Sequence, residues 1–346
     1  MDVRPQGHDI IRTWLFATMV RSHHQHGGVP WRNAALSGWI LDPDRKKMSK
    51  SKGNVVTPMH LLEQYGTDAV RYWAASGRPG VDTAFDESQM KIGRKLATKL
   101  LNATKFVLGF GEPEPGTLPT VAVDRAMLAR LAAVADDATT AFDGYDYARA
   151  LERTESFFWW FCDDYVELVK TRAYGTDELT PAEQADRASA RAALRIALSG
   201  MQRLFAPFLP FATDEVWSWW QQGSIHNAAW PTGDELRAAA NLRPDHHPAD
   251  DPAWLEPLSE VLAMVRRAKT EAKVSQRAEV STLTVHAPVE VQTAVERAVG
   301  DLRDAGSITA VVFHDAADTR CDVELAPVVT DPGTGTGTSA PTPPNS

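Results

Sequence analysis

Hydrophobic positions in the first quarter of the chain switch between short apolar runs and helical spacing, the pattern of an α/β segment. Ile11, Leu15 and Met19 recur every four residues, and a Gly-Gly pair follows at 27–28, where a helix would end. Apolar residues without alternation are typical of a buried strand. The predicted elements are a helix over 10–26, a strand over 35–41, a helix from Thr57-Pro58 to Gly66, and a helix over 68–76 capped by Thr67.

A longer helix is predicted over residues 86–108. Asp86 and Gln89 have the spacing of a capping box at its start. Its apolar stripe is Ile92, Leu96, Leu100, Ala103 and Val107, and its basic side chains are Lys91, Arg94, Lys95, Lys99 and Lys105. The Gly- and Pro-rich stretch 111–119 then indicates a domain linker.

The middle of the chain is predicted to be all helical. Long helices joined by short turns favour an antiparallel bundle. The aromatic run 157–161 could be mistaken for a base-stacking platform, but consecutive residues of a helix point in different directions, so most of these rings are expected in the core. The expected helices cover 122–142, 146–171, 181–205 and 209–221.

The last third returns to mixed structure. A polar connector over 232–253 precedes a helix over 254–274, and strands near 280–286, 308–313 and 322–325 flank a helix around 289–304. These elements predict a small α+β module. The whole chain is therefore divided into domains at 1–110, 120–245 and 250–328, with a disordered Pro-, Thr- and Gly-rich tail over 329–346.

Composition narrows the class of protein. With 346 residues and 43% hydrophobic content the chain can bury several cores. No apolar run approaches the roughly 20 residues that cross a bilayer. The two cysteines, Cys162 and Cys321, lie far apart, which argues against a structural disulfide. We therefore expect a cytoplasmic protein, and a monomer, because nothing resembles a dimerisation coiled coil.

Net charge is −9, but its distribution is uneven. Residues 1–110 carry 16 Lys and Arg against 9 Asp and Glu, a net +7, whereas the remainder carries 20 against 36, a net −16. A basic first third suits a phosphate-bearing partner, although ordinary surface unevenness would give the same count.

Candidate chemistry is concentrated in residues 44–54. Five of the nine residues from Asp44 to Lys52 are basic, and Ser, Gly and Asn permit an exposed loop. Ammonium groups can neutralise a polyphosphate, while hydroxyl and backbone N–H groups donate hydrogen bonds to it. A plain basic surface loop is the alternative.

The motifs around this loop resemble those of class I aminoacyl-tRNA synthetases. Residues 47–51 read KMSKS, the signature of that family, and they lie between the apolar run ending at Leu41 and the segment Gly53 to Pro58. The segments Gly7 to Trp14 and Gly66 to Tyr72 also resemble the family, as does the helical region 121–222. The resemblance implies the C-terminal half of a Rossmann-type catalytic domain, a helical-bundle anticodon-binding domain, and the small α+β module.

The resemblance also implies residue roles. Lys47 and Lys50 would be the catalytic contacts to ATP phosphates, assisted within the ATP-binding loop by Met48, Ser49 and Ser51. Gly7, His8, Asp9, Ile10 and Trp14 would bind the adenylate and amino acid. Ile10 and Trp14 match positions that line the side-chain pocket of valine-specific members, and as residues four apart they would share a helix face. Lys91, Arg94, Lys95 and Lys99 would hold tRNA phosphates.

The implied function is valine–tRNA ligation. ATP, with Mg²⁺, would activate valine to valyl-adenylate, and tRNA(Val) would accept the valyl group. No HIGH-type motif occurs in the sequence, so we expect that the isolated chain forms little adenylate and that a separate N-terminal half supplies the motif. No metal site is expected, because His23, His24 and His26 lack nearby partner ligands. The alternatives are an isoleucine- or leucine-type synthetase and a non-catalytic tRNA-binding fragment.

Overall fold

The computed structural model describes residues 1–176, 178–242 and 250–327, and the side chain of Lys50 is outside the described part. The chain forms two compact units, Met1–Ser259 and Glu260–Ser346. The first unit contains both of the first two predicted domains, and the division between them near residues 110–120 stays a prediction. The predicted tail over 329–346 lies outside the described residues.

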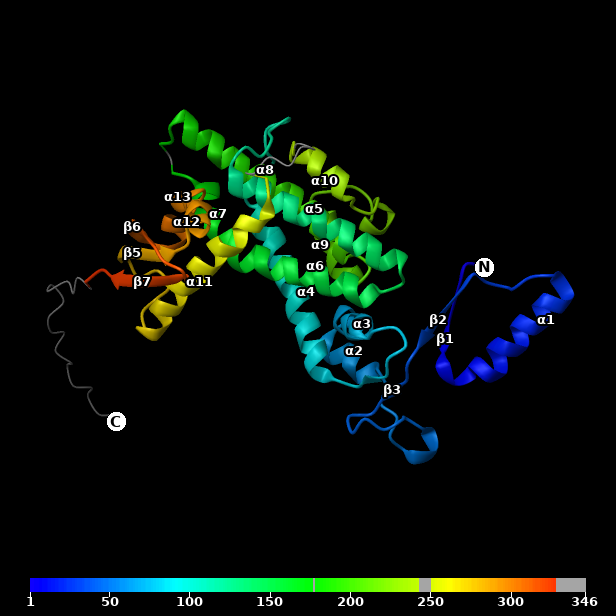
Figure 1. Ribbon diagram of the computed structural model, residues 1–346. Coiled ribbons are helices and arrows are strands. Elements are labelled where there is room, and N and C mark those ends of the chain that lie inside the picture. Colours follow the sequence, from blue (N-terminus) through cyan, green and yellow to red (C-terminus); the bar gives the residue numbers. More distant parts are fainter. Residues whose placement is uncertain (177, 243–249, 328–346) are drawn as a thin grey trace, which may run out of the picture. The chain divides into compact units, whose positions relative to one another are not determined.

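The chain begins with two parallel strands joined by a helix, as the α/β pattern predicts (Figure 1). The predicted helix over 10–26 starts irregularly, with a 3₁₀ turn and a π-helical turn before the α-helix. It ends where predicted, because Gly27 adopts a left-handed conformation with φ 71°. The elements are β1 (Val3–Gly7), the 3₁₀ turn His8–Ile10, the π turn Ile11–Leu15, α1 (Phe16–His26) and β2 (Asn33–Ser37).

The predicted strand over 35–41 is split at Gly38. A side chain there would collide with the backbone of Val81 and Asp82, so this segment crosses directly over the glycine. After the break, Ile40 and Leu41 pair in parallel with Thr83 and Ala84. The elements that follow are β3 (Ile40–Leu41), the 3₁₀ turn Lys50–Lys52, α2 (Met59–Tyr65), α3 (Thr67–Ser76), β4 (Thr83–Ala84) and α4 (Glu87–Leu108).

Helices α2, α3 and α4 pack together, and we call residues 59–108 the α2–α4 platform. Its core is Leu61, Tyr65, Ala69, Trp73 and Met90, with Val56, Val70 and Phe85 against it. Two details differ from the sequence prediction. Thr67 is the first residue of α3 and caps nothing, because Gly66 is the N-cap. Ile92 is 37% exposed, and Met90 and Gly93 are buried instead.

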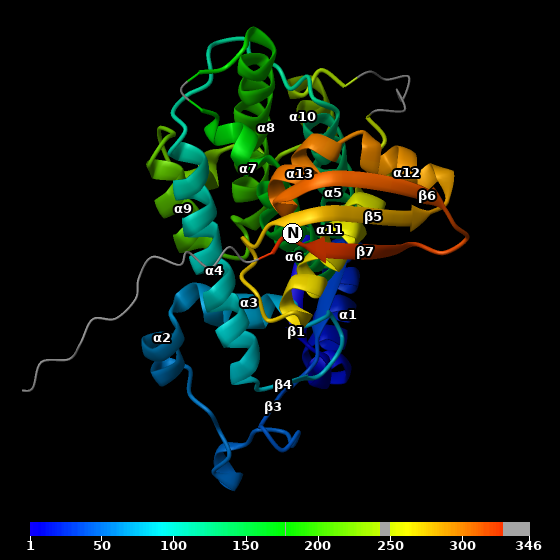
Figure 2. The same cartoon turned by 90° about the vertical axis from the view of Figure 1, so that its left-hand side faces the viewer.

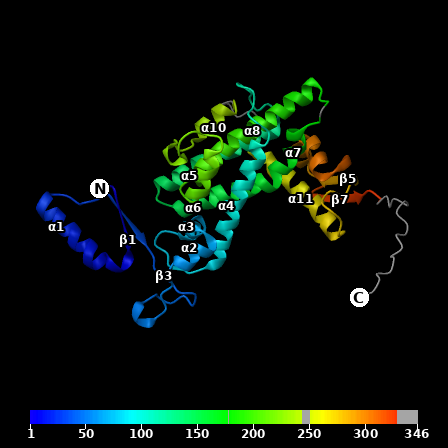
Figure 3. The ribbon, with the colours of Figure 1, turned by 180° about the vertical axis from the view of Figure 1, so that it is seen from behind.

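The bundle has the predicted helices, and α5, α8 and α10 lie side by side (Figure 3). Phe157, Phe158 and Phe161 are buried, as expected for core rings. A π turn interrupts the predicted helix over 146–171, and α10 lies in the stretch predicted as a connector. The elements are α5 (Ala122–Asp143), α6 (Tyr147–Trp160), the π turn Phe161–Tyr165, α7 (Val166–Tyr174), α8 (Pro181–Phe205), α9 (Pro210–Ser218), the 3₁₀ turn Ile225–Asn227 and α10 (Gly233–Ala239).

A buried carboxylate joins three helices of the bundle. Asp124 of α5 is 0% exposed and accepts hydrogen bonds from Tyr165 (2.8 Å), Ser189 (2.6 Å) and both terminal nitrogens of Arg172 (2.9 and 3.0 Å). A buried charge is tolerated when it is paired and fully hydrogen-bonded. The network therefore fixes α7 and α8 to α5.

The second unit contains a three-stranded sheet. Strand β5 lies between β6, its parallel neighbour, and β7, its antiparallel neighbour (Figure 2). Two short helices pack on this sheet, so the predicted α+β character is observed. The elements of the last third are the 3₁₀ turn Pro252–Trp254, α11 (Leu255–Glu271), β5 (Val280–Ala287), α12 (Val289–Glu296), α13 (Val299–Gly306), β6 (Ile308–Asp315) and β7 (Arg320–Leu325).

Candidate functional site

The carboxyl ends of β1 and β2 meet at one edge, where ligands of α/β folds bind. Strand β1 ends at Gly7, which pairs with Ser37 at the end of β2. His8 follows at once, and its Nδ1 lies 3.1 Å from the carbonyl oxygen of Ser37. Because a carbonyl oxygen only accepts, Nδ1 carries the hydrogen. The segment that begins at Gly7 is thus fixed to the neighbouring strand.

The KMSKS loop is closed at its base by two side chains. Asp42 accepts from the backbone N–H of Lys46 (2.7 Å) and from Nδ2 of Asn54 (2.7 Å). Asn54 Oδ1 accepts from the N–H of Ser49 (2.9 Å), and its Nδ2 also donates to the carbonyl of Lys47 (3.2 Å). The hydrogen bond from Asn54, followed by that from Lys46, lowers the pKa of Asp42 below its ordinary value. Ionised Asp42 therefore holds both ends of the loop.

The loop reaches the segment at the end of β1 through Lys47. Its Nζ lies 3.9 Å from Asp9 Oδ2 and 3.9 Å from the centre of the Trp39 ring. That ring also contacts His8, at 4.6 Å between ring centres. Lys47 and Asp9 are about half exposed, so water screens the ion pair and both groups are accessible. The structure thus brings together Lys47, His8 and Asp9, three residues predicted for one site.

The two serines of the motif, one on each side of Lys50 in the sequence, have their hydroxyls close together. The hydroxyls of Ser49 and Ser51 are 2.7 Å apart, and the backbone N–H of Lys52 donates to the carbonyl of Ser49. The backbone of Lys50 begins the 3₁₀ turn, but its side chain is outside the described part of the structure. The roles of Lys50, Met48, Ser49 and Ser51 stay predictions.

Trp14 contacts different residues from those that the helical spacing suggests. Its ring stacks on Trp31, with 5.8 Å between centres and an angle of 8°, and the guanidinium of Arg4 lies 4.1 Å from it. Trp14 is 42% exposed. Sharing a face with Ile10 presumed a regular α-helix, whereas the backbone here is a 3₁₀ turn followed by a π turn. A pocket formed by Ile10 and Trp14 stays a prediction, as does the role of Gly7.

The four basic residues predicted to hold tRNA lie on one side of α4. They line an open hollow of roughly 440 Å³ together with Tyr65, Thr98 and Asn102. Lys99 is 3.1 Å from Asp163, and Arg94 donates to the carbonyl of Gln64 at 2.8 Å. These partners orient the cations without enclosing them, which suits binding to phosphates. The four are Lys91, Arg94, Lys95 and Lys99.

Two further observations bear on the expected chemistry. Among residues 1–176, 178–242 and 250–327 there is no group of three His, Cys, Asp or Glu side chains that could hold a metal ion. In the same described ranges no helix is both long and apolar enough to span a membrane.

Comparison with known proteins matches two parts of the chain to two families. The family described as "tRNA synthetases class I (I, L, M and V)" matches residues 1–86, and the "Anticodon-binding domain of tRNA ligase" matches residues 124–285. The valine–tRNA ligase of Thermobifida fusca (strain YX) is 60% identical over 332 residues, which are 94% of this chain and 36% of that protein. That of Salinispora tropica is 56% identical over 344 residues, 95% of this chain and 38% of that protein.

The chain belongs to the valine–tRNA ligase family of class I aminoacyl-tRNA synthetases.

The resemblance found in the sequence is thereby confirmed, and the chain spans little more than a third of the length of these relatives. Two solved class I synthetases share the fold. A leucyl-tRNA synthetase of Agrobacterium radiobacter K84, in a ternary complex with tRNA and LeuAMS, gives a TM-score of 0.51 at 20% identity, covering 68% of this chain and 29% of that one. Methionyl-tRNA synthetase of Mycobacterium tuberculosis, in complex with methionyl-adenylate, gives a TM-score of 0.51 at 23% identity, covering 70% of this chain and 47% of that one.

Three contributors to this synthetase site were missed from the sequence. Trp39 joins Lys47 to His8, while Asp42 and Asn54 close the loop. The positions of Asp42 and Asn54, one on each side of the basic run, were the available signal. Their pairing depends on a turn in which Arg45 takes a positive φ of 61°, and no spacing rule shows this.

Proposed function

We propose that this chain supplies the ATP-phosphate loop and the tRNA-binding helices of a valine–tRNA ligase. The observation that carries the proposal is the approach of Lys47 to Asp9 and Trp39, because it joins the KMSKS loop to the strand-end segment that would meet the adenylate. The 60% identity to the Thermobifida fusca enzyme favours valine over isoleucine or leucine as the amino acid.

The proposed reaction has two steps. The carboxylate of valine attacks the α-phosphorus of Mg·ATP, forming valyl-adenylate and releasing pyrophosphate; a terminal ribose hydroxyl of tRNA(Val) then takes the valyl group and releases AMP. Neither step needs a protein nucleophile, so positioning and charge stabilisation supply the catalysis. Lys47 and Lys50 would stabilise the negative charge that grows on the departing pyrophosphate. Ser49 and Ser51 would donate hydrogen bonds to it.

Ionised Asp42 supports the phosphate contact of Lys47 indirectly, through the shape of the loop. By accepting from Lys46 and Asn54 it sets the shape of the loop, while Lys47 stays half exposed. Asp9 lies 3.9 Å from the ammonium of Lys47. A polyphosphate carries more charge than one carboxylate, so it would draw Lys47 away from Asp9, and Asp9 would then be available to the amino group or ribose of the adenylate.

The tRNA would lie along α4 and the bundle. Contacts to phosphates position a nucleic acid without reading its sequence, and the basic hollow on α4 fits that task. A segment that carries the HIGH motif, within one longer protein or as a separate chain, would complete the nucleotide site. The chain's coverage of 36% of its relative's length supports this partner.

The role of Lys47 is tested in a chimera that joins the N-terminal part of the Thermobifida fusca enzyme to this chain. Lys47→Ala should lower kcat for valine-dependent ATP–pyrophosphate exchange by about 100-fold, the usual effect of losing one transition-state donor, with little change in KM for valine. The matched control is Lys46→Ala, which removes an adjacent exposed ammonium that lies 3.5 Å from Asp44. Equal effects of the two substitutions would contradict the proposal.

A further inference from the structure

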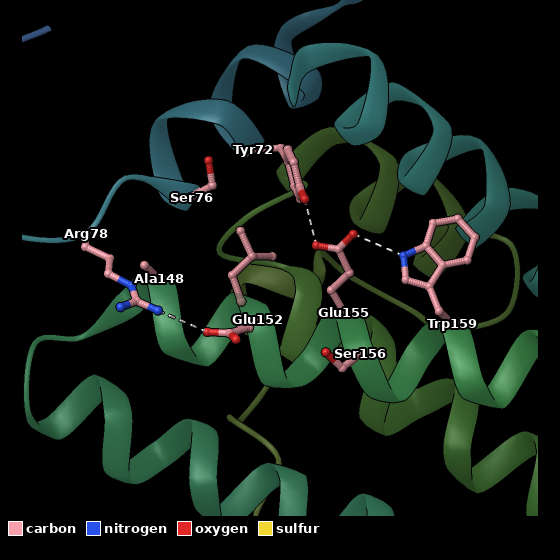
Figure 4. Close-up of a pocket in the computed structure, with 9 residues that line it drawn as sticks. Tyr72, Ser76, Arg78, Ala148, Glu152, Glu155, Ser156 and Trp159 are labelled. Atoms are coloured by element: carbon pink, nitrogen blue, oxygen red, sulfur yellow. Dashed lines mark hydrogen bonds and ion pairs between the residues drawn. The ribbon is translucent and has the colours of Figure 1, made fainter. Parts of the chain in front are cut away.

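Helix α3 and its N-cap, Gly66, contain the segment Gly66 to Tyr72, which resembles the family but has no role in the chemistry described above. Three of its side chains reach the bundle. One of them, Tyr72, lines a cavity of roughly 350 Å³ between α3 and α6, together with Arg78, Glu152, Glu155 and Trp159 (Figure 4). The other two, Asp68 and Arg71, contact α9 and the residues just before it.

Asp68 caps a helix of the bundle from 143 residues away. Its carboxylate accepts from the backbone N–H groups of Phe211 (3.1 Å) and Ala212 (2.7 Å), in the first turn of α9. The N-cap residue of α9, Leu209, makes no side-chain cap of its own. The first N–H groups of a helix have no partner within it, and a negative charge there is favourable. Asp68, 9% exposed, thus completes α9 and fixes it to α3.

Arg71 and Tyr72 add two bonds to other parts of the bundle. Arg71 Nε donates to the carbonyl of Pro207 at 2.7 Å, just before α9. The Tyr72 hydroxyl donates to Glu155 Oε2 of α6 at 2.7 Å, and Trp159 Nε1 donates to the other carboxylate oxygen at 3.0 Å. Burial and the bond to Glu155 raise the pKa of Tyr72, so its hydroxyl stays a donor at all physiological pH values.

Helix α3 is joined as firmly to the KMSKS loop. Only Val55 to Pro58 separate Asn54 from α2, and Gly66 alone separates α2 from α3. Val56 packs on the platform core, and Tyr65 of α2 donates to Glu87 of α4 at 2.6 Å. Strand β3, which leads into the loop, pairs with β4 immediately before α4. A shift of α3 relative to the bundle would therefore move the base of the loop.

We propose that Asp68, Arg71 and Tyr72 are positioning residues that lock the α2–α4 platform to the bundle. Through this lock, tRNA held by α4 and the bundle sets the position of the KMSKS loop. The second part rests on the proposed function, whereas the lock itself needs only the chain.

The test is hydrogen exchange, followed by mass spectrometry, of residues 42–65 with and without a tRNA(Val) transcript. In the wild-type chain tRNA should slow exchange in the loop by at least about threefold. In the variant Asp68→Ala with Tyr72→Phe, tRNA should bind within about twofold of wild-type affinity, yet the slowing should be lost. Its tRNA-free exchange in α2 should rise by at least about threefold.

Two further variants separate positioning from general damage. Glu152→Gln, one turn before Glu155 and paired with Arg78 at 3.7 Å, should match wild type. Asp68→Asn with wild-type Tyr72 keeps an acceptor for one N–H of α9 and should restore most of the loop slowing. If the double variant fails to fold, Tyr72→Phe alone removes a single hydroxyl and should show the same changes at smaller size.

The outcomes separate the two proposals. The coupling is overturned if tRNA still slows hydrogen exchange of the loop in the double variant. It is also overturned if the wild-type chain binds tRNA and its loop exchange does not slow. If the wild-type chain binds no tRNA, the proposed function fails, and the tRNA-free comparison then decides the lock. Unchanged exchange of α2 in the double variant overturns the lock.

Discussion

Close packing of α3 on α4 can be tested by adding one methyl group. Gly93 of α4 faces Tyr72, and a Cβ at this position would lie 2.7 Å from Tyr72 Cβ and 2.8 Å from its Cγ and Cδ1. Favourable carbon–carbon contacts need about 3.5–4.0 Å. Tyr72 cannot simply move away, because its hydroxyl is bound to Glu155. The prediction is that Gly93→Ala loosens the platform.

The expected size follows from two opposing effects. Overpacking a closely packed site costs about 1–3 kcal/mol. Replacing glycine by alanine within a helix returns up to about 1 kcal/mol. The free energy of local unfolding of α3 and α4 should therefore fall by about 1–2 kcal/mol. Because 1.4 kcal/mol corresponds to a tenfold change in an equilibrium constant, the locally open population should rise by about 5- to 30-fold.

Native-state hydrogen exchange of α3 and α4 measures this change. Gly300→Ala in α13 is the matched control: nothing lies within 4 Å of the added carbon, so exchange there should slow, by up to about fivefold for a gain of about 0.4–1 kcal/mol. The double variant Tyr72→Ala, Gly93→Ala should lose less local stability than the sum of the losses in the two single variants, because the added methyl group no longer collides with the Tyr72 ring. Unchanged or slower exchange of α4 in Gly93→Ala would refute the reasoning.

Three other predictions concern charge. The double variant Lys91→Ala, Lys95→Ala should lose two phosphate contacts, so the slope of the logarithm of the tRNA-binding constant against the logarithm of salt concentration should become shallower by about 2. The control is Lys170→Ala, which removes an ammonium paired with Glu167 and should leave this slope unchanged. The pKa of Asp42 lies below its ordinary 3.8, so its hydrogen bond to Asn54 is complete above that pH and is lost as the pH falls through the lowered pKa. The side-chain amide NMR resonances of Asn54 should report this loss. Asn54→Ala should raise the pKa of Asp42. An Asn54 signal that shifts between pH 5 and 8 would contradict it. Burial raises the pKa of the Cys162 thiol to about 12 and that of the Cys321 thiol to about 11, so at pH 8 about one Cys321 in a thousand is thiolate. The native chain should therefore react slowly with Ellman's reagent. Rapid labelling of either thiol would contradict this prediction.

Local patterns predicted most of the helices. The bundle helices have hydrophobic spacing, caps and turns that agree, so α5 and α8 begin and end within a residue or so of their predicted limits. The breaks inside elements were not predictable, because they depend on other parts of the chain. Strand 35–41 is split where residues 81–82 cross Gly38, and the helix through 161–165 widens to a π turn without any change in hydrophobic pattern.

The candidate site was predictable only as far as its motifs. Lys47 and Asp9 could be assigned to one site because each lies in a segment that matches the family. Trp39, which contacts both Lys47 and His8, lies between these two residues in the sequence without a motif of its own. Asp68 and its partners on α9 are 143 residues apart, and no local pattern joins such positions. Contacts of this kind follow from the tertiary fold, which the sequence pattern constrains only loosely.

Recognition of valine tRNA by this chain can be measured as binding of the purified chain to valine, isoleucine and leucine tRNA transcripts across a salt series. We expect the chain to bind the valine tRNA at least about tenfold more tightly than the other two, the value of one good base contact. The preference should follow the valine anticodon when it is placed in the other two tRNAs. Equal, weak binding to all three would contradict the assignment of valine tRNA recognition to these helices.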